Sequence, residues 1–389
     1  MPLSAWRILL TAFLILVGLA RGAAATDQQH PWLSDDMRYR SLSTALEQSL
    51  GYLRQRSAET TFTLGNRQVS RSHLVASLQA FRRIALARPS TQRLNILLSR
   101  YFVLYKVGGP NLFPQKNKVL VTGYYQPIIK GCLQRKPPYI HPLFAVPDDL
   151  AVRHHSPHST VGRLEGAAFS PYWSRAEIET QGKAKGHELV WLGDPFDAFN
   201  LHIQGSGLVS FPDGSTRGVH YASSNGHPYR SIGRYMVETG KMRLEEVSMS
   251  AIRHYLDNHP EERETILEHN PSFIFFEWSD AKGAIGNLGK ELVAGRSIAV
   301  DQHCFPPAAL GFLRTRKPLI DKGRVVNWVD LERFVTVHDT GSAIRGPQRL
   351  DLYWGTGEQA GLAAGHMKEN GTLYFLLLKE GLRPENIHL

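Results

Sequence analysis

The sequence predicts a mainly β chain whose N-terminal part is helical. Apolar residues recur at helical spacing between residues 41 and 105, which favours amphipathic helices there. Beyond that point the chain carries short apolar runs bounded by Gly, Pro, Asn and Asp, which are typical of strands. A length of 389 residues with 42% hydrophobic content allows a large core and favours two domains over one.

Residues 1–25 have the pattern of a secretory signal peptide. Arg7 precedes an apolar run over residues 8–20, and three alanines at 23–25 fit a cleavage site before Thr26. This run is shorter than the roughly 18 apolar residues that a spanning helix needs. Because no cysteine lies at the predicted cleavage site to accept a lipid, we expect an exported protein without a lipid anchor.

Three helices are predicted between residues 41 and 105, and Pro89 separates the second from the third. Each carries one apolar stripe, which we interpret as a surface facing the core. The stripes are Leu42, Leu46, Leu50 and Leu53, then Leu74, Leu78 and Phe81, and finally Leu94, Leu98 and Tyr101.

A strand is predicted over residues 119–127, and Tyr124 and Tyr125 stand near its end. Aromatic rings of this kind pack inside proteins, but they also cover the apolar face of a sugar. The next segment, residues 130–174, is rich in Pro, Gly and His, and we expect it to be rich in loops. Its histidines at 154, 155 and 158 are the best metal candidates, but we interpret them as a solvated loop and predict neither a metal nor a cofactor.

A second motif spans residues 196–207 and ends in Gln-Gly-Ser-Gly. Gly205 and Gly207 allow close backbone approach around Ser206, while Gln204 supplies both a donor and an acceptor, so the motif suits a polyhydroxylated ligand. A serine hydrolase is disfavoured because the Gly-X-Ser-X-Gly spacing is absent. Helices are expected after Ser231 and over residues 248–258 and 261–269.

Three aspartates mark the C-terminal region, where strands are predicted at residues 272–278 and 296–301 and on either side of a glycine-containing loop. Asp301, Asp339 and Asp351 each follow or interrupt an apolar run. The alternation of Leu350, Leu352 and Trp354 puts Asp351 and Tyr353 on the opposite face of their strand, toward a groove or solvent. An aspartic protease also has an Asp-Thr-Gly loop, but it needs two that share a proton, and this sequence has one.

Charge and cysteine content give weaker constraints. Lys and Arg exceed Asp and Glu by 45 − 35 = 10, an excess that suits an anionic polymer such as a cell wall. No sequence signature of nucleic-acid binding is evident. Cys132 and Cys304 can pair in an exported compartment, and the sequence leaves the paired and the free state open.

These motifs, in this order, resemble the membrane-bound lytic murein transglycosylase A family. The resemblance rests on TGYY at 122–125, HIQGSG at 202–207, NGHPYRSIG at 225–233, GRSIAVD at 295–301 and the segments at 339–346 and 351–355. It implies a C-terminal three-aspartate region within a double-psi β-barrel domain. We assign residues 26–126 and 272–389 to this discontinuous barrel domain and residues 127–271 to an inserted β-rich, glycan-binding domain, with a groove between them.

The resemblance also implies an activity. A lytic transglycosylase cleaves the β-1,4 bond between N-acetylmuramic acid and N-acetylglucosamine in peptidoglycan and leaves a 1,6-anhydromuramyl end. Asp351 matches the single catalytic acid of the family, and Asp339 and Asp301 are expected to support it through their charge or by bracing the loop. One carboxylate suffices because the C6 hydroxyl of the sugar is itself the nucleophile. The candidates for glycan binding are Tyr124, Tyr125, Gln204, Gly205, Ser206 and Tyr353.

Two alternatives stay open. The first is a cell-wall-binding or wall-loosening protein without catalysis, and the second is a conventional glycoside hydrolase with two carboxylates, for which Glu277 and Asp197 are the candidates to inspect. We expect a monomer in the periplasm of a Gram-negative bacterium, either soluble or associated with the outer membrane, with glycan strands as its partner. The sequence leaves open whether members of wall-synthesis complexes bind it.

Overall fold

The computed structural model describes residues 31–114, 118–155, 158–281, 283–341 and 343–389. The predicted signal peptide lies outside the described residues. Every contact below lies within the compact unit Leu33–Leu389.

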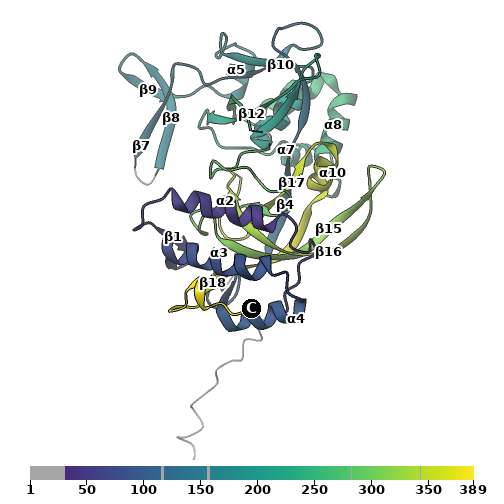
Figure 1. Ribbon diagram of the computed structural model, residues 1–389. Helices are drawn as coiled ribbons and strands as arrows, with labels where there is room; N and C mark the ends of the chain where they lie inside the picture. The colour runs from purple at the N-terminus through teal and green to yellow at the C-terminus, as the bar shows by residue number, and fades with distance from the viewer. Residues whose placement is uncertain (1–30, 115–117, 156–157, 282, 342) are drawn as a thin grey trace, which may run out of the picture. The chain divides into compact units, whose positions relative to one another are not determined.

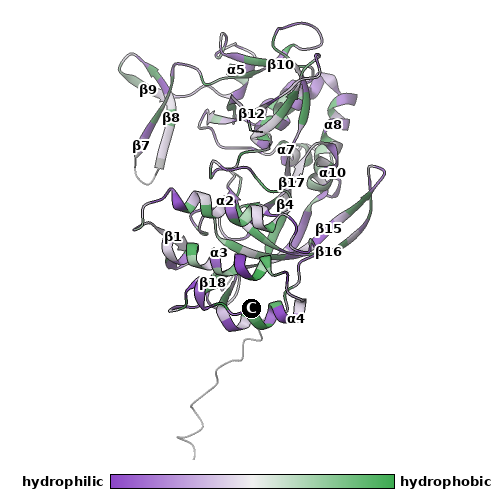
Figure 2. Cartoon of the chain, in the orientation of Figure 1, coloured by the Kyte–Doolittle hydropathy of each residue, from purple (hydrophilic) through white to green (hydrophobic). Residues whose placement is uncertain are grey.

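The predicted N-terminal helices are confirmed, and their apolar stripes are buried. Ser70 and Ser90 accept backbone N–H groups from His73 and Arg93 and so cap the second and third helices. Figure 2 shows hydrophobic and hydrophilic residues alternating along these helices. The elements are α2 (Leu42–Arg54), the hairpin of β1 (Thr61–Leu64) and β2 (Arg67–Ser70), α3 (Arg71–Leu86) and α4 (Thr91–Tyr101).

Seven strands of the described chain form one sheet, in the order β15-β16-β14-β17-β4-β18-β3. Because β15 also pairs with β18, six of them close into a barrel, and β3 extends it at one edge. The strands are β3 (Phe102–Lys106), β4 (Val119–Gln126), β14 (Ser297–Ala299), β15 (Leu310–Asp321), β16 (Arg324–Asp339), β17 (Arg349–Thr356) and β18 (Lys368–Leu378). The mainly β fold with N-terminal helices is therefore as predicted (Figure 1).

The main hydrophobic core lies between this barrel and the helices. Phe334 of β16 packs against Phe81 of α3 and Phe312 of β15, with ring centroids 4.6 and 5.0 Å apart. Helix α10 (Glu358–His366) joins β17 to β18 and lies on β4 and β17. Gly123 of β4 permits this close packing, since a Cβ there would lie 2.7 Å from the Ala364 Cα.

A second sheet has six described strands, in the order β13-β12-β11-β5-β10-β6, and its own hydrophobic core. Its last strand in sequence begins at Ile274, three residues after the boundary that we predict for the inserted domain. The strands are β5 (Ile128–Cys132), β6 (His141–Phe144), β10 (Glu188–Leu192), β11 (Ser206–Ser210), β12 (Thr216–Ser224) and β13 (Ile274–Ser279).

Helices accompany this second sheet. Ser231 and Ser248 cap α7 and α8 as expected, and the predicted 261–269 helix begins with a 3-10 turn. The sequence motif before Gly205 forms a helix that ends at this glycine in a left-handed conformation (φ 76°). The helices are α5 (Arg175–Glu179), α6 (Pro195–Gln204), α7 (Ile232–Glu238), α8 (Met249–Asn258) and α9 (Arg263–Glu268), with 3-10 turns at Leu244–Glu246, Pro260–Glu262 and Pro384–Asn386.

Residues 130–174, which we expect to be rich in loops, contain more strand than that expectation allows. Besides β5 and β6, this segment forms a separate antiparallel sheet of β7 (Leu150–His155), β8 (His158–Glu165) and β9 (Ala168–Pro171). The sheet exposes apolar residues, with Val152 at 41% and Leu164 at 50% exposure, so burial does not impose the alternation that identifies a strand. Across the described residues no cluster of three or more His, Cys, Asp and Glu side chains fits a metal ion.

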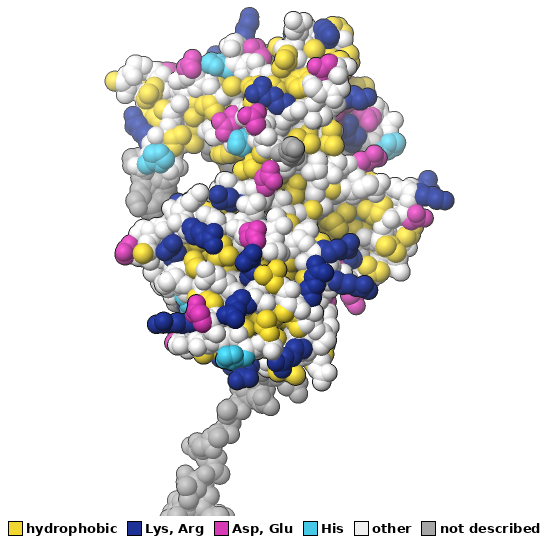
Figure 3. All heavy atoms as spheres, in the orientation of Figure 1, with side chains coloured by type: hydrophobic (Ala, Val, Ile, Leu, Met, Phe, Trp, Pro, Cys, Tyr) yellow, Lys and Arg dark blue, Asp and Glu magenta, His cyan; other side chains and the backbone are white. Residues whose placement is uncertain are grey.

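Cys132 is buried, Cys304 is partly buried, and both thiols are free. No helix within the described ranges is long and apolar enough to cross a membrane. In the view of Figure 3, Lys and Arg side chains outnumber Asp and Glu over the helical part of the surface, in keeping with the net charge of +10.

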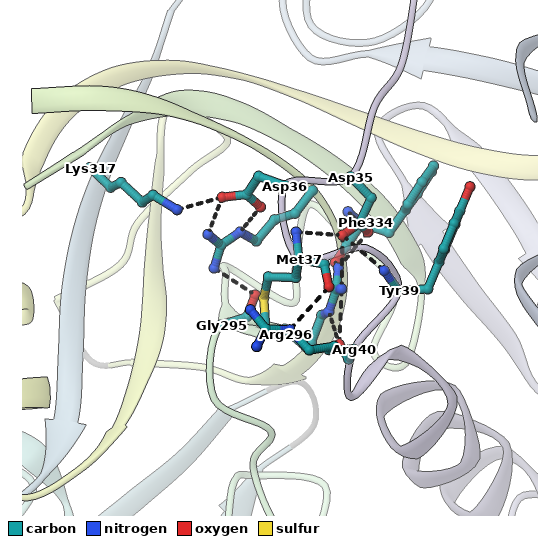
Figure 4. Close-up of polar contacts among 10 residues, drawn as sticks. Asp35, Asp36, Met37, Tyr39, Arg40, Gly295, Arg296, Lys317 and Phe334 are labelled. Atoms are coloured by element: carbon teal, nitrogen blue, oxygen red, sulfur yellow. Dashed lines mark hydrogen bonds and ion pairs between the residues drawn. The ribbon is translucent and has the colours of Figure 1, made fainter. Parts of the chain in front are cut away.

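Two aspartates, of which Asp35 has a buried side chain, hold the start of the compact unit against the barrel (Figure 4). Asp35 binds the guanidinium of Arg296 with both oxygens, at 2.7 and 2.9 Å, and the two side chains are only 2% and 0% exposed. The remaining Arg296 donors bind the carbonyl oxygens of Arg40 and Phe334. Asp36 makes a second pair with Arg333, at 2.8 and 2.6 Å. Each partner of the buried Asp35–Arg296 pair is therefore satisfied.

We expect Asp35→Ala to lower the free energy of unfolding by about 3–5 kcal/mol, because it leaves the Arg296 guanidinium buried without its counter-charge. Urea unfolding measures this loss. Glu47→Ala is the matched control, since Glu47 pairs with Arg82 on the surface and its removal should cost less than about 1 kcal/mol. Equal losses in both variants would contradict the role given to the buried pair.

Candidate active site

Strand register brings two of the three predicted aspartates together. Ala299 of β14 pairs with Asp351 of β17 on one side and with Asp339 of β16 on the other. Asp351 pairs in turn with Thr122 of β4. Residues directly opposite on neighbouring strands point to the same face, so one row of the barrel carries both carboxylates. Their Cα atoms lie about 10 Å apart across two strand spacings, with only the Ala299 methyl group between them.

The predicted alternation around Asp351 is confirmed. Leu350 and Leu352 are fully buried, whereas the Asp351 side chain retains 18% exposure. Tyr353 differs from the expectation of a solvent-facing residue, because it is 3% exposed and packs against the Tyr124 ring at 5.3 Å. The face of β17 that carries Asp351 is therefore only partly open.

Asp351 is held by two residues that the sequence analysis did not select. The Thr122 hydroxyl donates to Asp351 Oδ1. Arg349 donates from Nε to Oδ1 at 3.0 Å and from Nη2 to Oδ2 at 3.3 Å. Arg349 lies two positions before Asp351, so the period of a strand already places both side chains on one face. The Thr122 contact had no local signal, because it depends on the parallel pairing of β4 with β17.

Asp339 lies at the end of β16 and is partly exposed, as Asp351 is. Its Oδ1 accepts the backbone N–H groups of Asn287 and Thr340, each at 2.9 Å. Burial raises the pKa of Asp339 to about 6, against the lowering effect of these N–H groups, and the charge of Asp351 raises it further. The two aspartates are therefore electrostatically coupled.

Tyr124 lies beside Asp339. Its hydroxyl is buried and lies close enough to the Asp339 carboxylate to lower the pKa of that group. Burial raises the pKa of Tyr124 well above its ordinary value, and the Asp339 and Asp351 charges raise it further. Tyr124 thus keeps its proton and directs a hydrogen-bond donor toward Asp339.

Asp301 has a different environment, in the turn after β14. Its carboxylate accepts backbone N–H groups from Gly346 at 2.7 Å and from His303 at 2.9 Å, and it contacts His303 Nδ1 at 2.9 Å. Burial opposes ionisation, but these contacts outweigh it and lower the pKa of Asp301. Asp301 therefore ties the glycine-containing loop to the barrel, away from the Asp339–Asp351 row.

Four of the predicted sugar-binding residues have structural contacts within the protein. Gln204 Oε1 accepts the Tyr125 backbone N–H at 3.1 Å, and Asn200 donates to the Tyr125 hydroxyl at 3.1 Å. Ser206 is buried in β11, and Gly205 ends α6. These contacts connect the end of β4 in the barrel with α6 beside the second sheet.

His202 in the same motif is buried next to Arg175. Its Nδ1 lies 2.9 Å from Arg175 Nη2. Burial, and then the Arg175 charge, lower the pKa of His202 well below its ordinary value, so the ring is neutral. Its position in the core of the second sheet indicates a structural role.

The two carboxylates considered for a hydrolase have other partners. Glu277 contacts His220 at 2.7 Å, and Asp197 pairs with Arg253. Asp339 is the carboxylate whose pKa responds to Asp351. Asp339 and Asp351 share one face of the barrel, an arrangement that differs from two carboxylates flanking a bond on opposite sides.

Comparison with known proteins gives two family matches. The MltA specific insert domain matches residues 120–277, and the 3D domain matches residues 296–377. The membrane-bound lytic murein transglycosylase A of Escherichia coli strain K12 is 34% identical over 265 residues, which are 68% of this chain and 67% of that protein. The Vibrio cholerae protein of the same description is 32% identical over 269 residues, covering 68% and 67%.

Solved structures agree. The membrane-bound lytic murein transglycosylase from Agrobacterium tumefaciens aligns with a TM-score of 0.72 at 26% identity, over 88% of this chain and 93% of that one. The E. coli MltA with bound chitohexaose aligns with a TM-score of 0.66 at 26% identity, over 86% and 89%. This chain therefore belongs to the membrane-bound lytic murein transglycosylase A family.

Proposed function

We propose that this protein cleaves the β-1,4 bond between N-acetylmuramic acid and N-acetylglucosamine by intramolecular attack, with Asp351 as the single acid and base. Membership of the family supports the enzyme class, a peptidoglycan lytic transglycosylase. The chitohexaose bound to the E. coli relative supports a glycan strand as the ligand. We also propose that residues 1–25 direct the chain to the periplasm, where this substrate lies.

The arrangement of Asp351 is the observation that carries the proposal. Its carboxylate is partly exposed on the row shared with Asp339, while Asp339 Oδ1 is occupied by backbone N–H groups. A single carboxylate is what an intramolecular reaction requires, since the sugar supplies its own nucleophile. A two-carboxylate hydrolase would need a second group across the bound sugar.

In the proposed reaction, protonated Asp351 donates its proton to the glycosidic oxygen as the C1–O bond breaks. The C6 hydroxyl then attacks C1, and the Asp351 carboxylate accepts the hydroxyl proton. The acid is regenerated and no water is consumed.

We propose different contributions for the sugar-binding candidates. Tyr124, whose hydroxyl lies beside Asp339, contacts the glycan directly. Tyr353 supports the Tyr124 ring, while Tyr125, Gln204, Gly205 and Ser206 shape the groove through the contacts between β4 and α6. We propose that residues 127–271 form the inserted glycan-binding domain, together with β13, which completes its sheet.

Asp351→Asn should abolish release of soluble fragments from purified peptidoglycan, because an amide has no proton of suitable acidity. Mass spectrometry of the products tests both the rate and the 1,6-anhydro ends. The control, Asp321→Asn, changes an exposed aspartate at the end of β15 and should keep normal turnover. Near-normal turnover of Asp351→Asn would overturn the proposal. Reducing ends would indicate a hydrolase, and binding without release would indicate a wall-binding protein.

Asp339 should make stability depend on pH. Its folded-state pKa of about 6 lies above the ordinary 3.8. The contribution of Asp339 to the free energy of unfolding is therefore complete below about pH 4 and is lost as the pH rises to about 6. Asp339→Asn lacks this titration. The difference in free energy of unfolding, Asp339→Asn minus wild type, should therefore rise by about 2–3 kcal/mol between about pH 4 and 7. Urea unfolding across this range tests the prediction, which a constant difference would contradict.

A further inference from the structure

Arg349 binds the Asp351 carboxylate, and this contact must break before the proposed reaction begins. Two nitrogens of its guanidinium bind both carboxylate oxygens, Nε to Oδ1 at 3.0 Å and Nη2 to Oδ2 at 3.3 Å. Thr122 adds a donor at Oδ1. Such a two-point contact between guanidinium and carboxylate requires the ionised carboxylate.

A general acid must instead carry a proton. A guanidinium has only donors, so a protonated Asp351 would lose an acceptor oxygen and the charge that Arg349 binds. The pairing with Arg349 and the acid form of Asp351 therefore exclude each other. Before the first proton transfer, the Arg349 guanidinium needs another anionic partner.

The surroundings of Arg349 permit such an exchange. Its side chain is 33% exposed, and its third contact, from Nη1 to the Ala343 carbonyl oxygen, is long at 3.4 Å. Tyr229 lies close enough for the Arg349 charge to act on its hydroxyl. The guanidinium is thus at the surface of the site, beside the loop that carries the NGHPYRSIG motif.

Few other charges face Asp351. Asp339 approaches from β16, and the uncharged Tyr124 from β4. Lys368 of β18 pairs in register with Thr122 and is exposed. When Arg349 leaves, the Asp339 carboxylate remains as a charged neighbour of Asp351.

We infer that Arg349 binds a carboxylate of the substrate. When the guanidinium binds this group it leaves Asp351, and Asp351 changes from a paired carboxylate to an acid. This inference rests on the proposed function of Asp351. The ligand is a carboxylate on the lactyl-peptide branch of muramic acid, because an arginine fork matches a carboxylate and a neutral chitin oligomer has none. Asp351 takes one proton from solvent as the guanidinium moves, and no other group changes its charge.

A comparison of two substrates tests the binding site. The first is soluble, uncrosslinked glycan strands with free carboxylates, and the second is the same strands with these groups converted to methylamides. We expect this conversion to lower wild-type kcat/KM by about tenfold or more, the effect of one charge-assisted contact. Arg349→Gln should respond by less than about twofold, because it has already lost that contact.

Arg345→Gln is the matched control. Arg345 is an exposed arginine of the same loop, so its removal changes the charge of the region to the same extent. This variant should keep the wild-type preference for free carboxylates. The inference is overturned if Arg349→Gln keeps the preference or if Arg345→Gln loses it equally, since general electrostatic attraction would then explain the result.

The pH profile distinguishes the switch from a purely structural role. The profile of kcat/KM reports the free enzyme and that of kcat reports the complex. In the wild type, the alkaline limb of kcat/KM should lie at lower pH than that of kcat, because only the free enzyme has Arg349 on Asp351. In Arg349→Gln the two limbs should coincide. A gap that persists unchanged in the variant would overturn the switch.

Asp351→Asn separates failure of the switch from failure of the proposed function. If this variant is inactive on both substrates while Arg349→Gln behaves as wild type, only the inference about Arg349 fails. If Asp351→Asn retains activity, the proposed catalytic role fails, and the inference fails with it.

Discussion

The buried pair of Arg296 and Asp35 is the constraint on which the active-site row depends. Arg296 immediately precedes β14, which has only three residues. Ala299 of this strand pairs with Asp339 of β16 and with Asp351 of β17. A strand this short has few backbone hydrogen bonds of its own. The contacts of Arg296 therefore help to hold β14 in place between its two neighbouring strands. The pair joins residues 261 positions apart in sequence.

A second polar contact supports the same strand from the helical side. Ser297 Oγ lies 2.8 Å from His338 Nδ1, and His338 Nε2 lies 3.0 Å from Ser49 Oγ in α2. Burial lowers the pKa of His338 to about 4, so its ring is neutral and serves as a hydrogen-bonding bridge. Since His338 directly precedes Asp339, the helices and the barrel together set the position of that carboxylate. The N-terminal helices thus have a role in the site although they carry none of its predicted residues.

Sequence reasoning succeeded where the signal was local. The helical stripes and the alternation at Leu350, Asp351 and Leu352 follow from the periods of single elements. It failed where strands lack a buried face, as in β7, β8 and β9. The row of Asp339, Ala299, Asp351 and Thr122 could not be predicted because it requires four strands from distant parts of the chain. The different environments of Asp301 and Asp339 also depend on which backbone N–H groups the closed barrel brings to them.

The strand order has a consequence for the timing of folding. Both neighbours of β4 in the barrel, β17 and β18, come from the last part of the sequence, as does the partner of Asp35. During synthesis from the N-terminus, β4 and the Asp35 carboxylate lack these partners until the C-terminal part of the chain is available. Contacts of such separation form slowly. The barrel therefore cannot close, and the row of Asp339, Ala299, Asp351 and Thr122 cannot assemble, on an incomplete chain.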